Sequence, residues 1–527
     1  MRKPLLSLLL TVLTFLAFQV QGQNNTPPSC VITAPHNNAY FQEGKAMAIL
    51  VYASDVGGSF ANGTVSKVEF FNGPTKLGEA TTATHNTYSF VWSPLRAGTY
   101  TITAKATDNL NTVSTSAGVI VTVGATPAVS RGLSACKGKY LGNIIASNVP
   151  TPYSTLWNGI TPENNTKWGV VEPTRDVMNW AGANVAYTYA KNNHLLFRYH
   201  AFAWGSQFPT WAISPNNNLL LSPAEFQAEM EEYIAAVATQ FPSGIDQIDV
   251  LNENLRTHAP ATQAIRQGLG GAGATGHDWI IWMFAKARHY FPNSKLILND
   301  YGLENDQTAI NEQLQIIKLL RDRNLMDGFG TQAHEFNINT LSATQLKNSL
   351  DLMDNAGVPI YVTELDISGD DNTQRTRYQN LFPVYWEHPA VAGITLWGYE
   401  AGKTWKENTH LQTATGQDRP AMTWLRQYMA DRTQVGYPFC TQESLVTGID
   451  DEVTIPAAAV YPNPFNQDFT YKMTGRFSYQ LYSSTGALVQ SGTATDKVTL
   501  GSSLAKGMYV LRITQREAVK AIKLIKN

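Results

Sequence analysis

The segment QIDVLNEN (residues 247–254) is an apolar, β-branched run that stops at a carboxylate, Glu253. The segment IYVTELDIS (residues 360–368) has the same form and brings Glu364 to the end of its run. Both runs are typical of buried β-strands. Either glutamate alone could simply cap a strand or pair with a surface cation. Two carboxyl groups facing one sugar-ring site, however, are what cleavage of a glycosidic bond requires, because one protonates the leaving oxygen and the other stabilises or attacks the anomeric carbon.

The composition sets the scale of the molecule and excludes some partners. A chain of 527 residues is too long for one ordinary domain, so two to four are expected. A formal net charge of −2 gives no support for binding to nucleic acid or to an anionic membrane. The chain contains 12 Trp and 23 Tyr. Aromatic rings suit uncharged polar ligands such as sugars, although most of the Trp residues are expected to pack in cores.

The N-terminus predicts a secretory signal peptide over residues 1–22. It reads MRKP, then the apolar LLSLLLTVLTFLAF, then QVQGQ, with small residues before a cleavage site expected near Gly22. The apolar run is too short for a membrane span, and no later run is long enough. The mature protein is therefore expected to be soluble outside the cytoplasm, with no membrane span.

The three cysteines are Cys30, Cys136 and Cys440. An odd count leaves at least one thiol free or intermolecular, and none of the three has the spacing of a metal ligand. A disulfide between Cys136 and Cys440 would join the two ends of the middle region, but the sequence does not fix the pairing.

Residues 27–124 are predicted to form a small all-β sandwich. Short alternating runs recur between Gly, Asn and Pro residues, at 65–71, 87–92, 99–108 and 118–123. The segments KVEFFNG and AGTYTITAKATDN resemble those of bacterial immunoglobulin-like modules. Such modules serve as spacers or as carbohydrate binders, and a spacer is expected here. Residues 125–136 have the composition of a linker.

Residues 137–431 alternate apolar strands with longer helical segments, such as residues 224–241 and 277–291. Eight β/α units in roughly 300 residues predict an α/β fold, a TIM (β/α)8 barrel. The eight expected strands are residues 142–147, a segment near 160–164, and residues 195–204, 247–253, 295–301, 328–334, 360–368 and 393–400. Glu253 then ends strand four and Glu364 ends strand seven, so the two would face one another across the mouth of the barrel, where such enzymes carry their chemistry.

After a linker at residues 432–457, residues 458–527 are predicted to be β-rich again and to form a second small all-β sandwich domain. The opening VYPNPF, the strand KGMYVLRI and the lysine-spaced end KAIKLIKN resemble the C-terminal sorting domain of the type IX secretion system. The resemblance implies export through that machinery to the medium or the cell surface. The alternative is that this small sandwich has an unrelated role.

The middle region as a whole resembles glycoside hydrolase family 10, the retaining endo-1,4-β-xylanases. Seven motifs match in the order of the family: TPENNTKW (161–168), RYHAFAWGSQFPTW (198–211), DVLNEN (249–254), LILNDYGLE (296–304), TQAH (331–334), VTELDIS (362–368) and ITLWG (394–398). The resemblance implies that Glu253 is the acid/base and Glu364 the nucleophile. Asn252 is placed to bind the sugar 2-hydroxyl, the alternative being a turn asparagine.

The resemblance also assigns the remaining contacts with substrate. Gln332 and His334 would hold the nucleophile and the substrate, although a single barrel histidine is more often structural. The polar contacts on the glycone side would be Glu163, Asn164, Lys167 and His200, and the aromatic walls Trp397 and Trp405. Trp204 belongs to the strand-three motif and is expected to pack beneath His200.

Three departures from the family pattern concern the subsites. Gly205 stands where the family commonly has His, and Ile248 where many members have Trp. The segment AGKTWKENTHLQT (401–413) is unusual after strand eight. None of these changes removes a catalytic group.

The segment GLGGAG (268–273) fits a dinucleotide-binding pattern, but it does not directly follow a strand and is interpreted as a loop.

The sequence as a whole therefore predicts a secreted retaining endo-1,4-β-xylanase that acts on xylan or xylo-oligosaccharides. Two carboxylates suffice for the chemistry, so no cofactor and no metal are expected. One alternative is a catalytically weak or silent xylan-binding protein at the cell surface. The other is a barrel glycosidase acting on another β-glucan.

Overall fold

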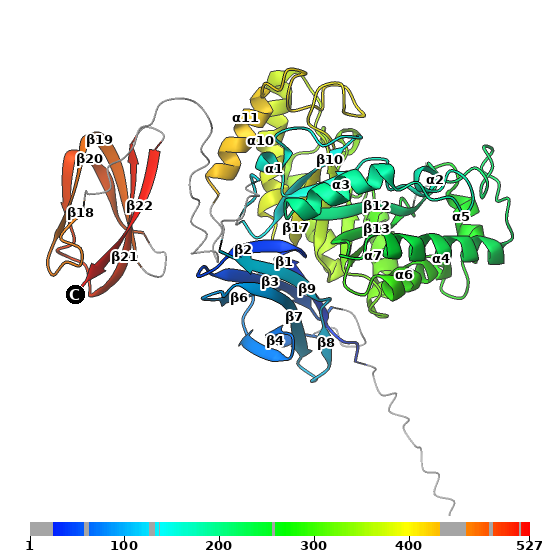
Figure 1. Ribbon diagram of the computed structural model, residues 1–527, viewed down its shortest axis with the longest axis horizontal. Coiled ribbons are helices and arrows are strands. Elements are labelled where there is room, and N and C mark those ends of the chain that lie inside the picture. The colour runs from blue at the N-terminus through cyan, green and yellow to red at the C-terminus, as the bar shows by residue number, and fades with distance from the viewer. Residues whose placement is uncertain are drawn as a thin grey trace, which may run out of the picture. The chain divides into compact units, whose positions relative to one another are not determined.

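The computed structural model describes residues 25–56, 63–125, 132–135, 137–255, 259–432, 460–483, 488–515 and 518–527. The predicted signal peptide, most of both predicted linkers, Cys136 and Cys440 lie outside the described residues. The chain divides into two compact units, Met1–Cys440 and Thr441–Asn527. The first unit holds an N-terminal β-module and a β/α barrel, and the second is a C-terminal β-sheet (Figure 1).

Eight parallel strands close into a barrel in sequence order, β17 pairing with β10. They are β10 (Tyr140–Ile145), β11 (Gly159–Pro162), β12 (Leu196–Trp204), β13 (Gln247–Asn252), β14 (Lys295–Asp300), β15 (Gly328–Thr331), β16 (Ile360–Leu365) and β17 (Val391–Leu396). Nearly every residue in them is buried, as expected of parallel strands covered on both faces. The predicted TIM barrel is confirmed, and each of the eight strands lies within a few residues of its expected place.

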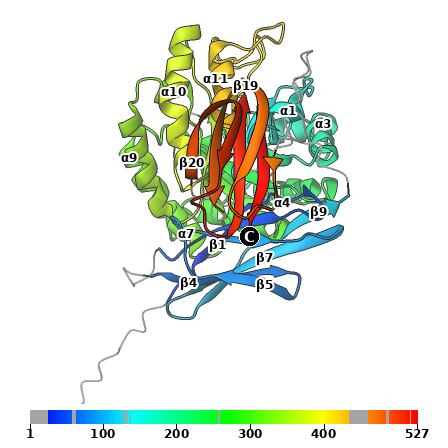
Figure 2. The same ribbon diagram turned by 90° about the vertical axis from the view of Figure 1, so that its left-hand side faces the viewer.

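Helices surround the barrel and connect its strands (Figure 1). They are α1 (Tyr153–Leu156), α2 (Trp168–Val171), α3 (Ala181–Asn192), α4 (Pro223–Gln240), α5 (Thr262–Gly268), α6 (Asp278–Tyr290), α7 (Gln307–Arg321), α8 (Glu335–Ile338), α9 (Ala343–Met353), the short 3-10 helix η1 (Asp354–Ala356), α10 (Asp371–Glu387) and α11 (Pro420–Ala430). Figure 2 shows α9 beside α10 on the outside of the barrel.

Helix α4 illustrates how the sequence sets a helix on the barrel. Ser222 and Glu225 form a capping box, and Pro223 occupies the first helical position, where its missing N–H is not needed. Its buried residues Phe226, Met230, Tyr233, Ile234 and Val237 recur at helical spacing and line the face that packs on the strands.

Three barrel strands carry one extra residue near the end where the predicted site lies. The register shifts between His200 and Ala203 in β12, between Asp249 and Leu251 in β13, and between Val362 and Leu365 in β16. An extra residue of this kind bends a strand and redirects the side chains that follow it. The irregularities in β13 and β16 adjoin the two candidate glutamates.

The N-terminal module consists of two β-sheets, β1-β3-β6 and β2-β9-β7-β4-β5, with β8 paired to β7 (Figure 2). Its strands are β1 (Ser29–Ala34), β2 (Ala39–Gln42), β3 (Met47–Ser54), β4 (Val65–Asn72), β5 (Thr75–Ala80), β6 (Thr87–Trp92), β7 (Gly98–Asp108), β8 (Val113–Thr115) and β9 (Val119–Gly124). Fully buried side chains from both sheets, including Ile49 and Phe70, form its core. Cys30 is a free, buried cysteine, and burial raises the pKa of its thiol to about 12.

The module contacts the barrel where the barrel strands begin. The Tyr52 hydroxyl donates a hydrogen bond to Asp354 Oδ1 at 3.0 Å, and Asp354 lies before β16. The Gly118 amide donates to Asn293 Oδ1 at 3.3 Å, and Asn293 lies just before β14. The His194 ring lies 3.2 Å from the Asn38 carbonyl, before β12. All three contacts are at the N-terminal ends of the strands, which in barrels of this type contribute to stability rather than catalysis.

The C-terminal unit is a separate β-sheet in the order β18-β19-β21-β22, with β20 paired to β19. Its strands are β18 (Val460–Tyr461), β19 (Phe469–Ser483), β20 (Leu488–Leu500), β21 (Gly507–Gln515) and β22 (Ala518–Lys526). Buried aromatic and aliphatic residues such as Phe469 and Leu511 form its core.

Among all the described residues, no helix is long and apolar enough to cross a membrane.

The contact between module and barrel predicts that Tyr52→Phe destabilises the protein. The change leaves the buried ring in place but removes its hydrogen bond to Asp354, so we expect a loss of about 1 kcal/mol in the free energy of unfolding, measured in urea. Tyr100→Phe is the control, because the Tyr100 hydroxyl bonds only within the module, to the exposed Arg96 carbonyl. Equal stability of Tyr52→Phe and the wild type would contradict the docked arrangement.

Candidate active site

Both candidate glutamates lie at the C-terminal end of the barrel. Glu253 directly follows β13, and its amide donates to the Asn299 carbonyl on β14 at 2.8 Å. Glu364 is the penultimate residue of β16, and its amide donates to the Gln332 carbonyl at 3.0 Å. Glu253 has a φ of +59°, a left-handed conformation that costs a non-glycine residue about 1 kcal/mol. Backbone strain at this position is typical of a side chain held for function.

A chain of side-chain amides connects the two carboxyl groups. Asn299 Nδ2 donates to Glu364 Oε1 and to Asn252 Oδ1, both at 2.8 Å. Gln332 Nε2 donates to Asn252 Oδ1 at 3.2 Å and to Glu253 Oε1 at 3.3 Å. Asn252 Oδ1 thus accepts twice, which fixes the orientation of its amide. Its Nδ2 makes only a long contact with Glu253, at 3.5 Å, and remains able to donate to a ligand.

Basic side chains hold Glu364 in its ionised form. Its side chain is buried, which by itself would raise the pKa. His200, His334 and Arg198 outweigh burial and lower the pKa of Glu364 to about 2. His334 Nε2 lies 3.3 Å from Glu364 Oε2. Glu364 is therefore a buried carboxylate that is charged at any ordinary pH, as a nucleophile must be.

His334 is held in turn by Asp366. Its Nδ1 lies 3.0 Å from Asp366 Oδ2, and the Trp405 indole N–H donates to the same oxygen. Burial acts to lower the pKa of His334, but Asp366 and Glu364 outweigh it and raise the pKa to about 10. The imidazole is therefore a cation at neutral pH, with Asp366 setting its orientation.

The pKa of Glu253 is shifted in the opposite direction to that of Glu364. Burial raises the pKa of Glu253, and the negative charge of Glu364 raises it further. A carboxyl group with a raised pKa can hold a proton near neutrality and give it up in a reaction. Two carboxyl groups whose environments separate their pKa values are what an acid and a nucleophile in one site require.

The predicted glycone-side residues gather after β11 and in β12. Lys167 Nζ donates to Asn164 Oδ1 at 2.9 Å and lies 4.4 Å from the centre of the Trp204 ring. Burial lowers the pKa of Lys167 to about 8, and burial also raises the pKa of Glu163. The ring of His200 lies edge-on to Trp397, 5.2 Å away. Trp204 thus forms a platform for Lys167, a role beyond the expected packing beneath His200.

All the predicted site residues therefore lie at the same end of the barrel. Several partners of theirs were not anticipated, notably Arg198, Asp249 and Asp366. Asp249 Oδ2 accepts from His200 Nδ1 at 2.7 Å, and Arg198 Nε donates to Asp249 Oδ1 at 3.1 Å. These residues had one visible signal, a charged side chain inside an otherwise apolar strand. Such a side chain must find a partner in the barrel interior.

The departures from the family pattern have structural explanations at two positions. A Cβ at Gly205 would lie 2.5 Å from Thr262 Oγ1, and the Gly205 carbonyl accepts the Ala261 amide at 2.9 Å. The segment entering α5 thus fills the space that a larger side chain would need. Ile248 is fully buried in the hydrophobic core and does not line the site.

Comparison with known families identifies all three parts of the chain. The model of Glycosyl hydrolase family 10 matches residues 132–428, more than half of the 527 residues. The chain belongs to glycosyl hydrolase family 10. The model of a Bacterial Ig domain matches residues 28–104, and that of a Secretion system C-terminal sorting domain matches residues 459–527. The sorting domain indicates export, with a secreted or cell-surface destination.

Relatives of the family 10 region include named xylanases. Endo-1,4-beta-xylanase B of Cellvibrio japonicus (strain Ueda107) is 42% identical over 290 residues, which cover 54% of this chain and 45% of that protein. Endo-1,4-beta-xylanase A of Caldicellulosiruptor saccharolyticus is 27% identical over 270 residues, covering 48% of this chain and 78% of that protein. The chain therefore spans less than half the length of the Cellvibrio relative.

A solved structure supports the fold. The family 10 protein of Paenibacillus barcinonensis superimposes with a TM-score of 0.50 at 24% sequence identity, covering 59% of this chain and 99% of that one. At this sequence identity the structural similarity supports the barrel fold and gives no information about the substrate.

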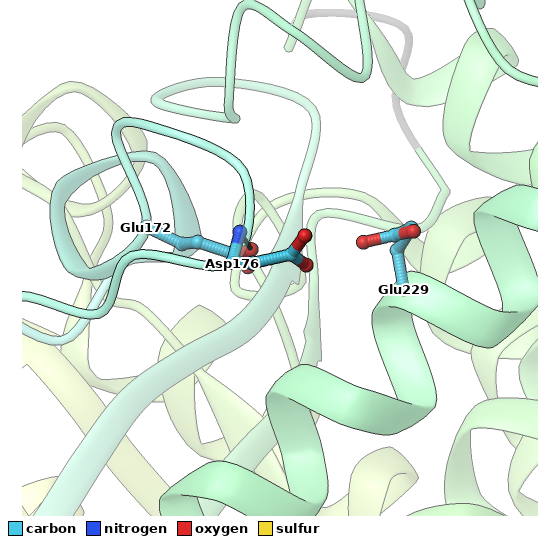
Figure 3. A group of neighbouring side chains, drawn as sticks. All are labelled: Glu172, Asp176 and Glu229. Atoms are coloured by element: carbon cyan, nitrogen blue, oxygen red, sulfur yellow. Dashed lines mark hydrogen bonds between the residues drawn. The ribbon is translucent and has the colours of Figure 1, made fainter.

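A second group of acidic residues lies outside this site. Figure 3 shows Asp176 between Glu172 and Glu229, with Glu229 on α4. Glu172 accepts the Trp168 indole N–H at 2.8 Å and the Asp176 amide at 2.9 Å. Arg175 Nε donates to Glu229 at 3.0 Å. Hydrogen-bond donors of the protein and the charge of Arg175 thus satisfy much of this acidic cluster, and we assign no metal ion to it.

The His334–Asp366 pair predicts a histidine that stays protonated at pH 8. We expect ¹⁵N chemical shifts of an imidazolium for His334 at that pH, and a lower pKa in Asp366→Asn. Because the folded pKa lies above 6.5, this pair stabilises the protein fully below pH 6.5, and the stabilisation is lost as pH rises through about 10. A neutral His334 at pH 8 in the wild type would contradict this electrostatic arrangement.

Proposed function

We propose that this chain is a secreted retaining endo-1,4-β-xylanase, exported by the type IX secretion system. The observation that carries the proposal is the pair Glu253 and Glu364, joined by an amide chain and shifted in opposite directions in pKa. Membership of family 10 and the names of its relatives support xylan as the substrate. The sorting domain supports export.

In the first step, the ionised Glu364 attacks the anomeric carbon while Glu253 donates its proton to the leaving oxygen. The glycosidic bond breaks, the leaving part departs as an alcohol, and the sugar is held as an ester of Glu364. A retaining mechanism needs the two carboxyl groups about 5–5.5 Å apart. Asn252 Nδ2 is free to donate to the sugar 2-hydroxyl, where hydrogen bonding strengthens towards the transition state.

In the second step, the role of Glu253 changes because Glu364 has lost its charge. Glu364 is neutral as an ester, so it no longer raises the pKa of Glu253. Glu253, now ionised, takes a proton from a water molecule that attacks the anomeric carbon. The ester bond breaks, Glu364 regains its negative charge, and His334 with Arg198 stabilises that charge. The configuration at the anomeric carbon is retained after two inversions.

Product analysis distinguishes this proposal from its two rivals. The purified protein is incubated with xylan, cellulose and mixed-linkage glucan, and the products are identified. Xylo-oligosaccharides from xylan alone are expected. Products from another glucan in preference to xylan would favour a different barrel glycosidase. Binding to xylan without any product would favour a silent surface-binding protein, although the intact charge network around Glu364 argues against that outcome.

Removal of the nucleophile is predicted to abolish turnover while leaving xylan binding. Glu364→Ala loses the attacking group, so xylan hydrolysis should fall by at least about four orders of magnitude, the scale seen when a covalent nucleophile is removed. Glu231→Gln is the matched control, because Glu231 pairs with Lys286 on the outside of the barrel. Full activity in Glu364→Ala would refute the assignment.

The effect of removing the acid Glu253 on the rate is predicted to depend on the leaving group. Glu253→Gln cannot protonate the leaving oxygen, so xylan cleavage should slow by about 10²- to 10⁴-fold. Aryl xylosides with good leaving groups depart without that proton and should be affected far less in the rate of bond cleavage. Rates measured on both substrates give the comparison. An equal loss on the two would count against the acid role of Glu253.

A further inference from the structure

The loop after β17, residues 401–410, carries Trp405 at the mouth of the barrel. This loop contains no helix or strand. Trp405 itself is 43% exposed and does not belong to the hydrophobic core of the barrel. Nevertheless its ring lies 4.7 Å from that of His334, and its indole N–H donates to Asp366. Groups outside the loop must therefore fix the position of this side chain.

Trp405 is connected to the nucleophile through two other side chains. Its N–H is accepted by Asp366 Oδ2, the atom that also lies 3.0 Å from His334 Nδ1. On the other side of the imidazole, His334 Nε2 lies 3.3 Å from Glu364 Oε2. A shift of the loop would therefore remove a donor from Asp366 and disturb the histidine that holds Glu364.

Two buried side chains outside the loop hold its end in place. Gln374, in the first turn of α10, is fully buried, and its Nε2 lies 3.1 Å from the His410 carbonyl and 3.2 Å from the Thr409 carbonyl. Arg419, the residue before α11, is also buried, and its Nη1 donates to the His410 carbonyl at 2.8 Å. The end of the loop is thus bonded to α10 and to the residue that precedes α11.

The same two side chains also hold the loop after β16, which carries Asp366. Gln374 Nε2 lies 3.0 Å from the Ile367 carbonyl, and Arg419 Nη2 donates to the Gly369 carbonyl at 2.8 Å. Each of the two side chains therefore bonds to both loops. Together they set the distance between the indole donor on one loop and its carboxylate acceptor on the other.

The value of Gln374 lies in the carbonyl groups that its nitrogen binds. Its Oε1 is buried and has no hydrogen-bond partner among the described residues. Burial of an amide oxygen without a partner costs free energy, and an apolar side chain of similar length would avoid that cost. The contribution of an amide at this position is therefore its N–H groups, which join the two loops.

We propose that Gln374 and Arg419 are positioning residues that hold Trp405 in its bond to the carboxylate beside the active-site histidine. Through that bond they keep His334 in place next to Glu364. The inference rests on the proposed xylanase function and adds to it two residues that act at a distance. Catalytic groups must be held within a fraction of an ångström, and supporting hydrogen bonds supply that precision.

The test follows the Trp405 indole N–H by NMR and the rate of xylotetraose hydrolysis, both in the full chain. Gln374→Met keeps the length of the side chain but cannot donate to the two loops. Loss of the bond to Asp366 should move the indole proton resonance of Trp405 upfield and speed its exchange with solvent. We expect kcat/KM to fall about tenfold, the scale of a small misplacement of catalytic groups.

A second background shows whether the effect on the rate passes through the indole. In Trp405→Ala there is no ring to position, so adding Gln374→Met should lower kcat/KM by less than about twofold further. An equal fall in both backgrounds would show that Gln374 only stabilises the barrel, and would overturn the inference. Wild-type rates with an unshifted indole resonance in Gln374→Met would also overturn it.

Arg419→Lys is the second variant, and it decides the question if Gln374→Met does not fold. It keeps the positive charge but loses the planar group that bonds to both loops. The same upfield shift of the Trp405 indole is expected, and an unshifted resonance would contradict the inference.

Gln427→Met is the matched control. Gln427 is exposed on α11 and donates to Asp431 at the end of that helix, so its substitution should change neither the resonance nor the rate. The indole measurement needs no turnover. A wild-type protein that cleaves no xylan would therefore overturn the proposed function alone, since the resonance still decides whether Gln374 positions Trp405.

Discussion

The proposed active site depends on keeping one buried carboxylate charged. Removal of a carboxylate from water disfavours its charged form, and Glu364 is almost completely buried. His334, His200 and Arg198 reverse that preference, and each is fixed by a further carboxylate, Asp366 or Asp249. Burial raises the pKa of Glu253, and the charge of Glu364 raises it further. One ionised group thus helps to keep its partner protonated, and in the proposed mechanism the order of proton transfers follows from this.

The barrel supplies the rigidity that this electrostatic arrangement needs. The residues that hold the two glutamates lie on or directly after β12 to β16, and their backbones are hydrogen-bonded from strand to strand. The register shifts in β13 and β16 and the left-handed conformation of Glu253 are local departures from regular structure. Such strain persists only where the surrounding structure fixes it, and the closed barrel does so.

The sequence predicted the barrel, its strands and the position of Glu253 and Glu364 at the ends of two of them, because apolar runs ending in polar residues are visible in one dimension. It did not predict β1, β2, β3, β5 or β8 of the module, where short or uneven runs give little periodicity. Nor did it predict the partners of the site residues. Arg198 and Asp249 are 51 residues apart, and their pairing exists only because β12 and β13 are neighbours in the closed barrel.

The contact between Gly205 and the segment entering α5 makes two distant positions interdependent. Thr262 and Ala259 fill the space beside Gly205, so a histidine there would collide with the first residue of α5 and with the loop that leads into it. A family member with histidine at this position must route that loop differently. Exchange of substrate preference between such enzymes would therefore require the residue and the loop to be transferred as one unit. Substitution of the glycine alone would report a packing defect and not a change in specificity.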